Sequence, residues 1–162
     1  LIYITLATLL AISTGFSQSD MDIVEESVIY TFEGATYEGY VAYDRNNTAK
    51  RTGVVVFHQW MGLTDYEKRR CHQLAELGYV AFAADMYGQG IRPKDRTEAA
   101  AEAGKFYADR VMFRKRANAA VAQLSKVKLA DPTKTVAIGY CYGGTAVLEL
   151  ARSGADIDGV VS

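Results

Sequence analysis

The sequence predicts an α/β fold in which helices cover both faces of a mostly parallel sheet. Three continuous apolar runs, at residues 53–58, 79–84 and 134–138, are typical of strands that are buried on both faces. Segments of helical character separate these runs, and such alternation indicates a parallel sheet. We therefore expect the three runs to be neighbouring, parallel strands.

The N-terminal segment differs from the rest of the chain. Residues 1–12 are apolar and uncharged, and small residues follow them up to Ser17. This pattern resembles the second half of a secretory signal peptide. We expect 1–17 to be the remnant of a signal peptide, cleaved after Ser17, and 18–26 to be a linker. An apolar strand of the fold is the alternative for this segment. The protein would be periplasmic or secreted if the signal peptide is real, and cytoplasmic otherwise.

The other elements follow in order along the chain. Turn and periodicity signals predict a hairpin of two strands at 27–32 and 36–43, helices at 65–77, 95–107, 111–126 and 145–152, and a last strand at 157–161. Thr64 or Asp65 would cap the first helix and Gly78 would end it. Its apolar positions Tyr66, Leu74 and Leu77 fall on one face with Cys71, so we expect Cys71 to be a core residue.

Composition excludes several classes of function. The chain has 162 residues, is 49% hydrophobic and 23% charged, and carries a formal net charge of −1. These values are typical of a soluble globular domain and give no basic patch for nucleic acid. Its two cysteines, Cys71 and Cys141, form neither a disulfide framework nor a metal-ligand spacing. We expect no metal and no cofactor, and no stable membrane insertion.

The most informative motif is the run Gly-Tyr-Cys-Tyr-Gly-Gly at 139–144. It joins the strand at 134–138 to the helix at 145–152, and a nucleophile between a strand and a helix on such a turn is called a nucleophile elbow. Gly139 and Gly143 would give clearance where side chains would collide, and Gly144 would let the helix approach the strand. Cys141 is the expected nucleophile, beneath a helix N-terminus that favours thiolate. The alternative is a buried cysteine in a glycine-rich connection.

Active sites of parallel sheets lie at the carboxyl ends of the strands. The sequence places three loops there, which begin at His58, at Asp85 and at Tyr140. The residues that we expect to line the site are His58, Gln59, Tyr87 and Tyr140. For His58 two roles remain open: a hydrogen bond to the backbone near the site, or proton transfer. His72 is expected on a helix surface.

Over residues 27–162 the chain resembles the dienelactone hydrolase family of the α/β-hydrolases. The likeness is carried by the elbow, by the run Val-Val-Val-Phe-His-Gln-Trp-Met-Gly at 54–62, and by Leu-Ala-Glu-Leu-Gly-Tyr-Val-Ala at 74–81 with Asp-Met-Tyr-Gly at 85–88. The resemblance implies a three-layer α/β-hydrolase sandwich, here truncated at its C-terminal side.

The resemblance also implies a Cys-His-Asp triad that hydrolyses small esters and lactones through a thioester acyl-enzyme. Cys141 matches the nucleophile, and the backbone N–H groups of Tyr142 and Trp60 match the oxyanion hole. Gln59 stands where the family often has Glu. Because no histidine follows Cys141, we expect the triad acid and histidine beyond Ser162, in a longer reading frame of which this chain, without a starting Met, is a fragment.

Two other functions remain as alternatives. A hydrolase fold that binds a partner without turnover would agree with Gln59 and with the missing histidine. A class I glutamine amidotransferase has a similar Gly-x-Cys-x-Gly elbow, but usually carries Gln shortly after it, where this chain has Thr145-Ala146.

Overall fold

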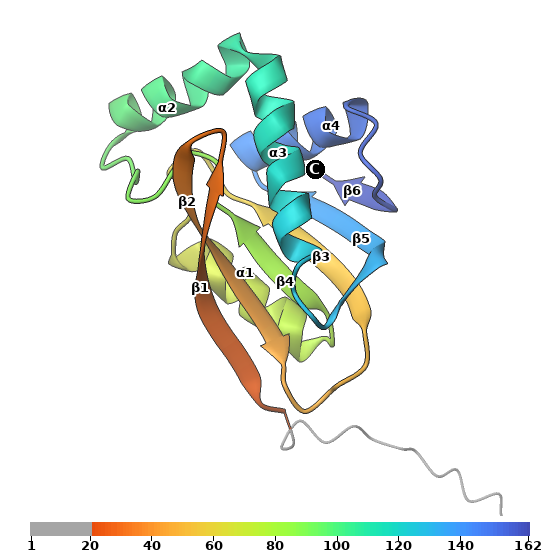
Figure 1. Ribbon diagram of the computed structural model, residues 1–162. Helices are drawn as coiled ribbons and strands as arrows, with labels where there is room; N and C mark the ends of the chain where they lie inside the picture. Colours follow the sequence, from red (N-terminus) through yellow and green to blue (C-terminus); the bar gives the residue numbers. More distant parts are fainter. Residues whose placement is uncertain (1–20) are drawn as a thin grey trace, which may run out of the picture.

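The computed structural model describes residues 21–162, which form six strands and four helices (Figure 1). In chain order these elements are β1 (Ile23–Phe32), β2 (Ala35–Asp44), β3 (Arg51–Phe57), α1 (Asp65–Glu76), β4 (Val80–Ala84), α2 (Arg96–Ala108), α3 (Arg110–Leu124), β5 (Ala130–Gly139), α4 (Tyr142–Arg152) and β6 (Gly159–Val161). The signal peptide predicted at 1–17 lies outside the described residues.

The strands form one mixed sheet in the order β1-β2-β4-β3-β5-β6. The strand β3 pairs in parallel with both β4 and β5, and β5 pairs in parallel with β6. The prediction that the runs at 53–58, 79–84 and 134–138 are parallel neighbours is therefore confirmed. The hairpin adds an antiparallel edge, because β2 pairs antiparallel with β4.

The hairpin of β1 and β2 turns through two residues, Glu33 and Gly34. Both have positive φ angles, of 48° and 79°, as a tight type I′ hairpin turn requires. The strand β1 begins at Ile23 rather than at residue 27, so the linker predicted at 18–26 is wrong from residue 23 onward. Glu25 and Glu26 are exposed positions of this edge strand, and Val24 beside them is buried.

Helices cover both faces of the sheet and make three layers (Figure 1). On one face, Val54 and Val56 of β3 pack with Cys71 of α1 in one apolar cluster. On the opposite face, Val55 and Phe57 belong to the larger cluster that contains the buried side chains of α2, α3 and α4. Successive side chains of a strand point to opposite faces, so the single run of β3 supplies both clusters.

The helix α1 turns a different face inward from the one that the apolar pattern predicted. Its buried residues are Glu67, Cys71 and Ala75, whereas Leu77 is 74% exposed. The prediction that Cys71 is a core residue is confirmed. The spacing of four residues between the buried positions matches one helix face, and a carboxylate occupies one of them.

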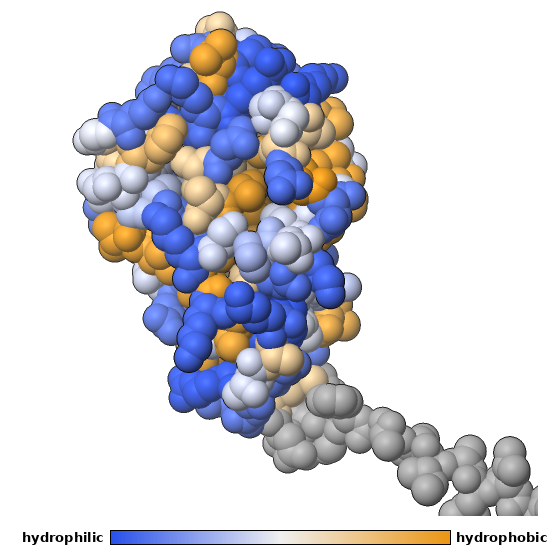
Figure 2. Space-filling model, turned by 45° about the vertical axis from the view of Figure 1, so that its right-hand side comes forward, coloured by the Kyte–Doolittle hydropathy of each residue, from blue (hydrophilic) through white to orange (hydrophobic). Residues whose placement is uncertain are grey.

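The surface view in Figure 2 shows hydrophobic residues in separate patches among hydrophilic ones. Within residues 21–162, no helix is long and apolar enough to cross a membrane.

Candidate active site

The loops that follow β3, β4 and β5 start side by side. The last residue of β3, Phe57, is in register with Ala84 at the end of β4 and with Gly139 at the end of β5. Because the three strands are parallel, their carboxyl ends lie at one edge of the sheet. The register therefore places the loops that contain His58, Asp85 and Cys141 at this edge, as predicted.

Cys141 occupies the tip of the turn between β5 and α4. Its φ is 56° and its ψ is −110°, a strained conformation for a residue with a side chain, and it stands at the N-cap position of α4. The residue is exposed. These observations contradict the alternative of a buried structural cysteine and present the thiol to solvent at the start of a helix.

The glycines beside Cys141 permit the tight turn. A Cβ atom on Gly139 would overlap the carbonyl of Gly143, and a Cβ atom on Gly143 would overlap the carbonyl oxygen of Phe57. On Gly144 a Cβ atom would lie 2.7 Å from the hydroxyl oxygen of Ser162, which follows β6. The predicted clearance roles of Gly139 and Gly143 are confirmed, whereas the close approach of the helix to the strand at Gly144 stays a prediction, because the nearest atom there belongs to the Ser162 side chain.

Two backbone N–H groups, one in the elbow and one in the loop after β3, have no partner among the described residues. Among residues 21–162, nothing accepts a hydrogen bond from the N–H of Trp60 or of Tyr142, whereas Gly143 and Gly144 donate to the carbonyls of Tyr140 and Cys141. A free N–H directly after the nucleophile and another from the loop after an earlier strand are the donors of an oxyanion hole.

The side chain of Tyr142 anchors the elbow in the core. Its ring is fully buried and stacks on Phe113, with centroids 5.1 Å apart, and on His58, with centroids 5.5 Å apart. The hydroxyl has no hydrogen-bond partner in the structure, and burial raises the pKa of this phenol. Tyr142 therefore contributes a backbone group to the site and an aromatic anchor to the core.

His58 is fully buried, and both of its ring nitrogens are engaged. Nε2 accepts a hydrogen bond from the Met86 N–H at 3.2 Å, and Nδ1 lies 2.5 Å from the Gln59 carbonyl oxygen. Burial lowers the pKa of this imidazole from 6.5 to about 4. The geometry favours the backbone-binding role for His58 over the proton-transfer role.

Glu67, which the sequence analysis overlooked, organises the loop between β3 and α1. Its carboxylate accepts hydrogen bonds from the Gln59 N–H at 3.3 Å, and from the N–H and the hydroxyl of Thr64 at 2.9 and 2.7 Å. Thr64 and Glu67 form a capping box. The signal was present in the sequence as Thr-x-x-Glu before a helix.

Tyr87 connects the loop after β4 to the same segment. Its hydroxyl donates a hydrogen bond to the Trp60 carbonyl at 2.9 Å, and its ring meets the edge of His58 with centroids 4.7 Å apart. The buried carboxylate of Asp85 accepts from the N–H groups of Tyr87 and Gly88 and fixes this loop in turn. Tyr87 thus supports the loop that carries Trp60.

Tyr140 directly precedes Cys141, but its side chain is held by α1. Its hydroxyl accepts a hydrogen bond from Nε of Arg70 at 2.9 Å, and its ring makes an edge contact with Tyr66. These contacts assign Tyr140 to the packing of the elbow against α1.

The two thiols of the chain have opposite environments. Cys71 is fully buried, and this burial raises its pKa, which disfavours the thiolate. Cys141 is exposed at a helix N-terminus. Within residues 21–162, no three His, Cys, Asp or Glu side chains gather closely enough to hold a metal.

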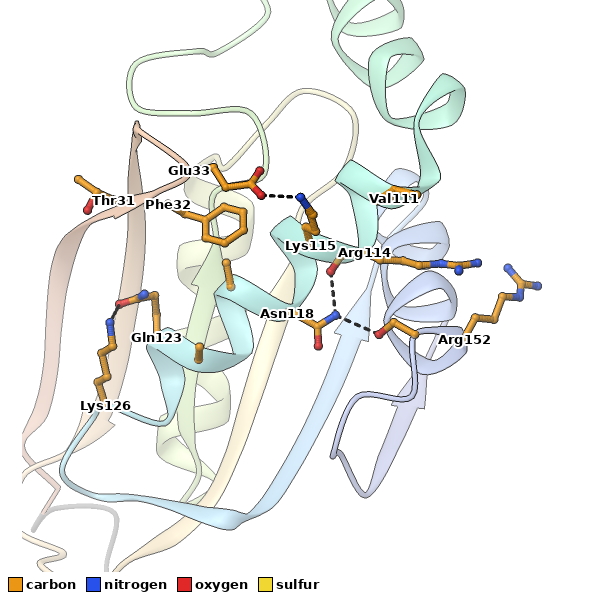
Figure 3. A pocket seen from close by; sticks show the side chains of 13 residues that line it. Thr31, Phe32, Glu33, Val111, Arg114, Lys115, Asn118, Gln123, Lys126 and Arg152 are labelled. Carbon is orange, nitrogen blue, oxygen red and sulfur yellow. Dashed lines mark hydrogen bonds and ion pairs between the residues drawn. The ribbon is translucent and has the colours of Figure 1, made fainter.

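A large groove of about 910 Å³ lies elsewhere, between the tip of the hairpin and α3 (Figure 3). Phe32, Glu33 and Asn118 are among the residues that line it. Glu33 forms an ion pair with Lys115, and the Asn118 amide donates a hydrogen bond to the Ser153 hydroxyl. None of the residues placed at the elbow or in the loops around it lines this groove. The elbow and the loops around it, and not this groove, therefore form the candidate active site.

Comparison with known proteins shows the family of the chain. The dienelactone hydrolase family matches residues 37–162. The chain belongs to the dienelactone hydrolase family. The family predicted from the elbow and the two preceding segments is confirmed.

Two relatives from Aquifex species support the assignment to this family. A protein of Aquifex aeolicus (strain VF5) named "Putative carboxymethylenebutenolidase" is 33% identical over 78% of this chain and 54% of its own length. "Protein usf" of Aquifex pyrophilus is 30% identical over 82% of this chain and 57% of its own length. The chain thus spans about half the length of these relatives.

Solved structures show the same fold. The structure called "m3DLH" matches with a TM-score of 0.82 and 36% identity, over 85% of this chain and 57% of that one. A dienelactone hydrolase-like promiscuous phosphotriesterase, P91, from metagenomic libraries matches with a TM-score of 0.82 and 37% identity over the same shares. The predicted α/β-hydrolase sandwich is confirmed, with helices on both faces of a mixed sheet.

Proposed function

We propose that this chain carries the nucleophile and the oxyanion hole of a hydrolase that acts on small esters or lactones. The observation that carries the proposal is the exposed thiol of Cys141 on a strained elbow. The unpartnered N–H groups of Tyr142, in the elbow, and of Trp60, in the loop after β3, support it. Membership of the dienelactone hydrolase family supports the same reaction class.

In this mechanism the sulfur of Cys141 attacks the substrate carbonyl carbon. The C=O electron pair moves to oxygen, and the resulting oxyanion is held by the two N–H groups. The intermediate then collapses, the C–O bond to the leaving alkoxide breaks, and a thioester remains on Cys141. Water attacks that thioester and releases the acid and the thiol.

The proton steps require a base that none of the residues near the elbow supplies. His58 has both nitrogens bonded to the backbone, and His72 lies on α1 between Glu25 and Glu76. Gln59 carries an amide, which does not accept the thiol proton. A helix N-terminus stabilises a thiolate by only about 0.3–1 kcal/mol, which is less than one pKa unit. We propose that the triad acid and histidine follow Ser162.

The test compares Cys141→Ala with Cys71→Ala in the full-length protein. With an activated ester such as p-nitrophenyl acetate, Cys141→Ala is expected to abolish turnover, and Cys71→Ala to retain most of it. Mass spectrometry after a brief reaction should find the acyl group on the peptide that contains Cys141. Turnover that survives in Cys141→Ala would refute the proposal, and absence of turnover in the wild type with retained ligand binding would favour the non-catalytic alternative.

A phosphotriester belongs in the same assay as a second substrate. One solved relative, 37% identical to this chain, is described as a promiscuous phosphotriesterase. A phosphoryl oxygen can occupy the same two-donor site as a carbonyl oxygen, so phosphotriester turnover should also depend on Cys141.

A further inference from the structure

The imidazole of His58 is held in one tautomer by its two hydrogen bonds. A backbone N–H can only donate, so Nε2 of His58 must be the unprotonated nitrogen that accepts from Met86. The ring proton of the neutral imidazole is then on Nδ1, which donates to the carbonyl of Gln59. His58 therefore joins the loop after β4 to the loop after β3.

The carbonyl that accepts this bond belongs to the same peptide unit as the Trp60 N–H. A trans peptide is planar, with its C=O and N–H pointing in opposite directions. The described residues contain no cis peptide bond. Fixing the direction of the Gln59 C=O therefore fixes the direction of the Trp60 N–H.

The two neighbouring peptide units are also fixed. The N–H of Gln59 donates to Glu67, and the C=O of Trp60 accepts from the hydroxyl of Tyr87. Three successive peptides thus each have a side-chain partner. The middle one is held by His58 and also by the backbone, because the Gln59 carbonyl accepts from the Gly62 N–H at 3.2 Å. Among residues 21–162, no group accepts a hydrogen bond from the N–H of Trp60, so this N–H is left for a ligand.

His58 also contacts the second donor of the site. Its ring stacks on the ring of Tyr142, with an interplanar angle of 13°. The elbow passes close to the same residue, because a Cβ atom on Gly143 would lie 2.7 Å from the His58 carbonyl oxygen. One buried side chain therefore touches the two segments whose N–H groups would form the oxyanion hole.

We propose that His58 is a positioning residue: its Nδ1–H holds the Gln59–Trp60 peptide so that the Trp60 N–H, together with that of Tyr142, faces the oxyanion formed at Cys141. This inference rests on the proposed function. His58 transfers no proton in this role. It keeps one donor of the hole in place before substrate arrives, so that none of the transition-state stabilisation is lost in orienting the peptide.

The test uses two substitutions that each retain one of the two bonds. In His58→Asn the side-chain amide lies near the position of Nδ1 and can still donate to the Gln59 carbonyl. In His58→Gln the amide reaches the position of Nε2 and can still accept from the Met86 N–H. Each variant loses one hydrogen bond, so a merely structural residue would give two variants with similar stability and similar activity.

The expected result is a difference in kcat. His58→Gln should lower kcat by about 100-fold or more, as loss of an oxyanion-hole donor does, while KM changes little. His58→Asn should stay within about 10-fold of the wild type at neutral pH. His72→Gln, on the exposed side of α1, is the matched control and should retain wild-type kcat. Urea unfolding of each full-length variant reports its stability.

Equal kcat losses in His58→Asn and His58→Gln would overturn the proposal. If neither variant folds, Tyr87→Phe takes their place: it removes the bond to the Trp60 carbonyl and keeps the ring, and an unchanged kcat would then contradict positioning of this stretch by its side-chain bonds. These outcomes differ from failure of the proposed function, in which Cys141→Ala would retain turnover whatever the His58 variants do.

Discussion

At the scale of single residues, burial decides the chemistry of His58. The imidazole has no access to water, and its ring contacts the aromatic rings of Tyr87 and Tyr142. The charged groups that act on it are Glu67 of α1, which favours protonation, and Arg92 of the loop after β4, which opposes it. Burial outweighs both, and the pKa falls to about 4.

We expect this pKa to make folding sensitive to pH. The unfolded chain takes up a proton on His58 below about pH 6.5, whereas the folded chain takes it up only near pH 4. The folded state therefore loses stability as the pH falls from 6.5 to 4, by about 3 kcal/mol for this one group. Urea unfolding at pH 7 and pH 4 should show a smaller loss for His58→Asn than for the wild type. Identical losses would contradict the assignment of a buried neutral imidazole.

The residues of the site were predictable to different degrees. Cys141 and its glycines follow from sterics that act within six residues, so the pattern of the sequence is sufficient. The bond of His58 to Gln59 is local, but its other bond depends on Met86, which is distant in sequence and comes close only through the pairing of β3 with β4. No local pattern contains that contact, so the sequence left two roles for His58 open.

At the scale of elements, the elbow brings three segments of backbone into close contact: the end of β3, the end of β5 and the start of α4. The carbonyl of Phe57 at the end of β3 lies where a side chain on Gly143 would be, and the carbonyl of Gly143 lies where a side chain on Gly139 would be. The neighbouring atoms belong to the backbones of a strand and a helix start, which cannot move aside without breaking the sheet pairing. A small residue is therefore required by the turn itself.

Gly143→Ala is expected to destabilise the fold by about 3 kcal/mol or more, because the added methyl group overlaps backbone atoms. The matched control is Gly104→Ala in α2, where nothing lies within 4 Å of the new Cβ atom. That change should stabilise by about 0.5–1 kcal/mol through helix propensity. Thermal unfolding of both variants measures the contrast, and similar melting temperatures would disprove the steric account.

The helix α1 shows why its inward face was only partly predicted. Leu74 and Leu77 suggested an apolar face, but Leu77 stands at the exposed C-terminal end of the helix. Glu67 is buried because backbone N–H groups of the preceding loop need an acceptor there. Hydrophobicity alone ranks Glu67 as exposed. The Thr-x-x-Glu pattern indicates its bond to Thr64, but its bond to the Gln59 N–H forms only when the loop is folded.

At the scale of the whole molecule, two apolar clusters lie on the two faces of one sheet. The larger contains Phe113, whose ring is fully buried and contacts the rings of Phe106 and Tyr142. This cluster joins α2, α3 and α4 to the sheet, so it connects the elbow to the rest of the core. The parallel centre was predictable from apolar runs, but the antiparallel attachment of β2 to β4 was not, because no residue pattern specifies which strand a hairpin will join.

We expect Phe113→Ala to lower the free energy of unfolding by about 3–5 kcal/mol, the usual cost of emptying such a site. Val111 stands in the same helix and is 63% exposed, so Val111→Ala should change stability by less than about 0.5 kcal/mol. Urea denaturation monitored by circular dichroism measures the free energy of unfolding of both variants. A small effect of Phe113→Ala would mean that the cluster does not hold α3 on the sheet.

The sheet order also bears on the sequence of events in folding. The contacts of β1 with β2 join neighbouring segments, and the turn at Glu33 and Gly34 brings them together early. Trp60 and Cys141, by contrast, are about 80 residues apart, and such long-range pairing closes slowly because the intervening chain must first be ordered. The pairing of β5 with β3 is the step that brings them together. Until that step, the thiol of Cys141 lacks the Trp60 N–H of the proposed oxyanion hole.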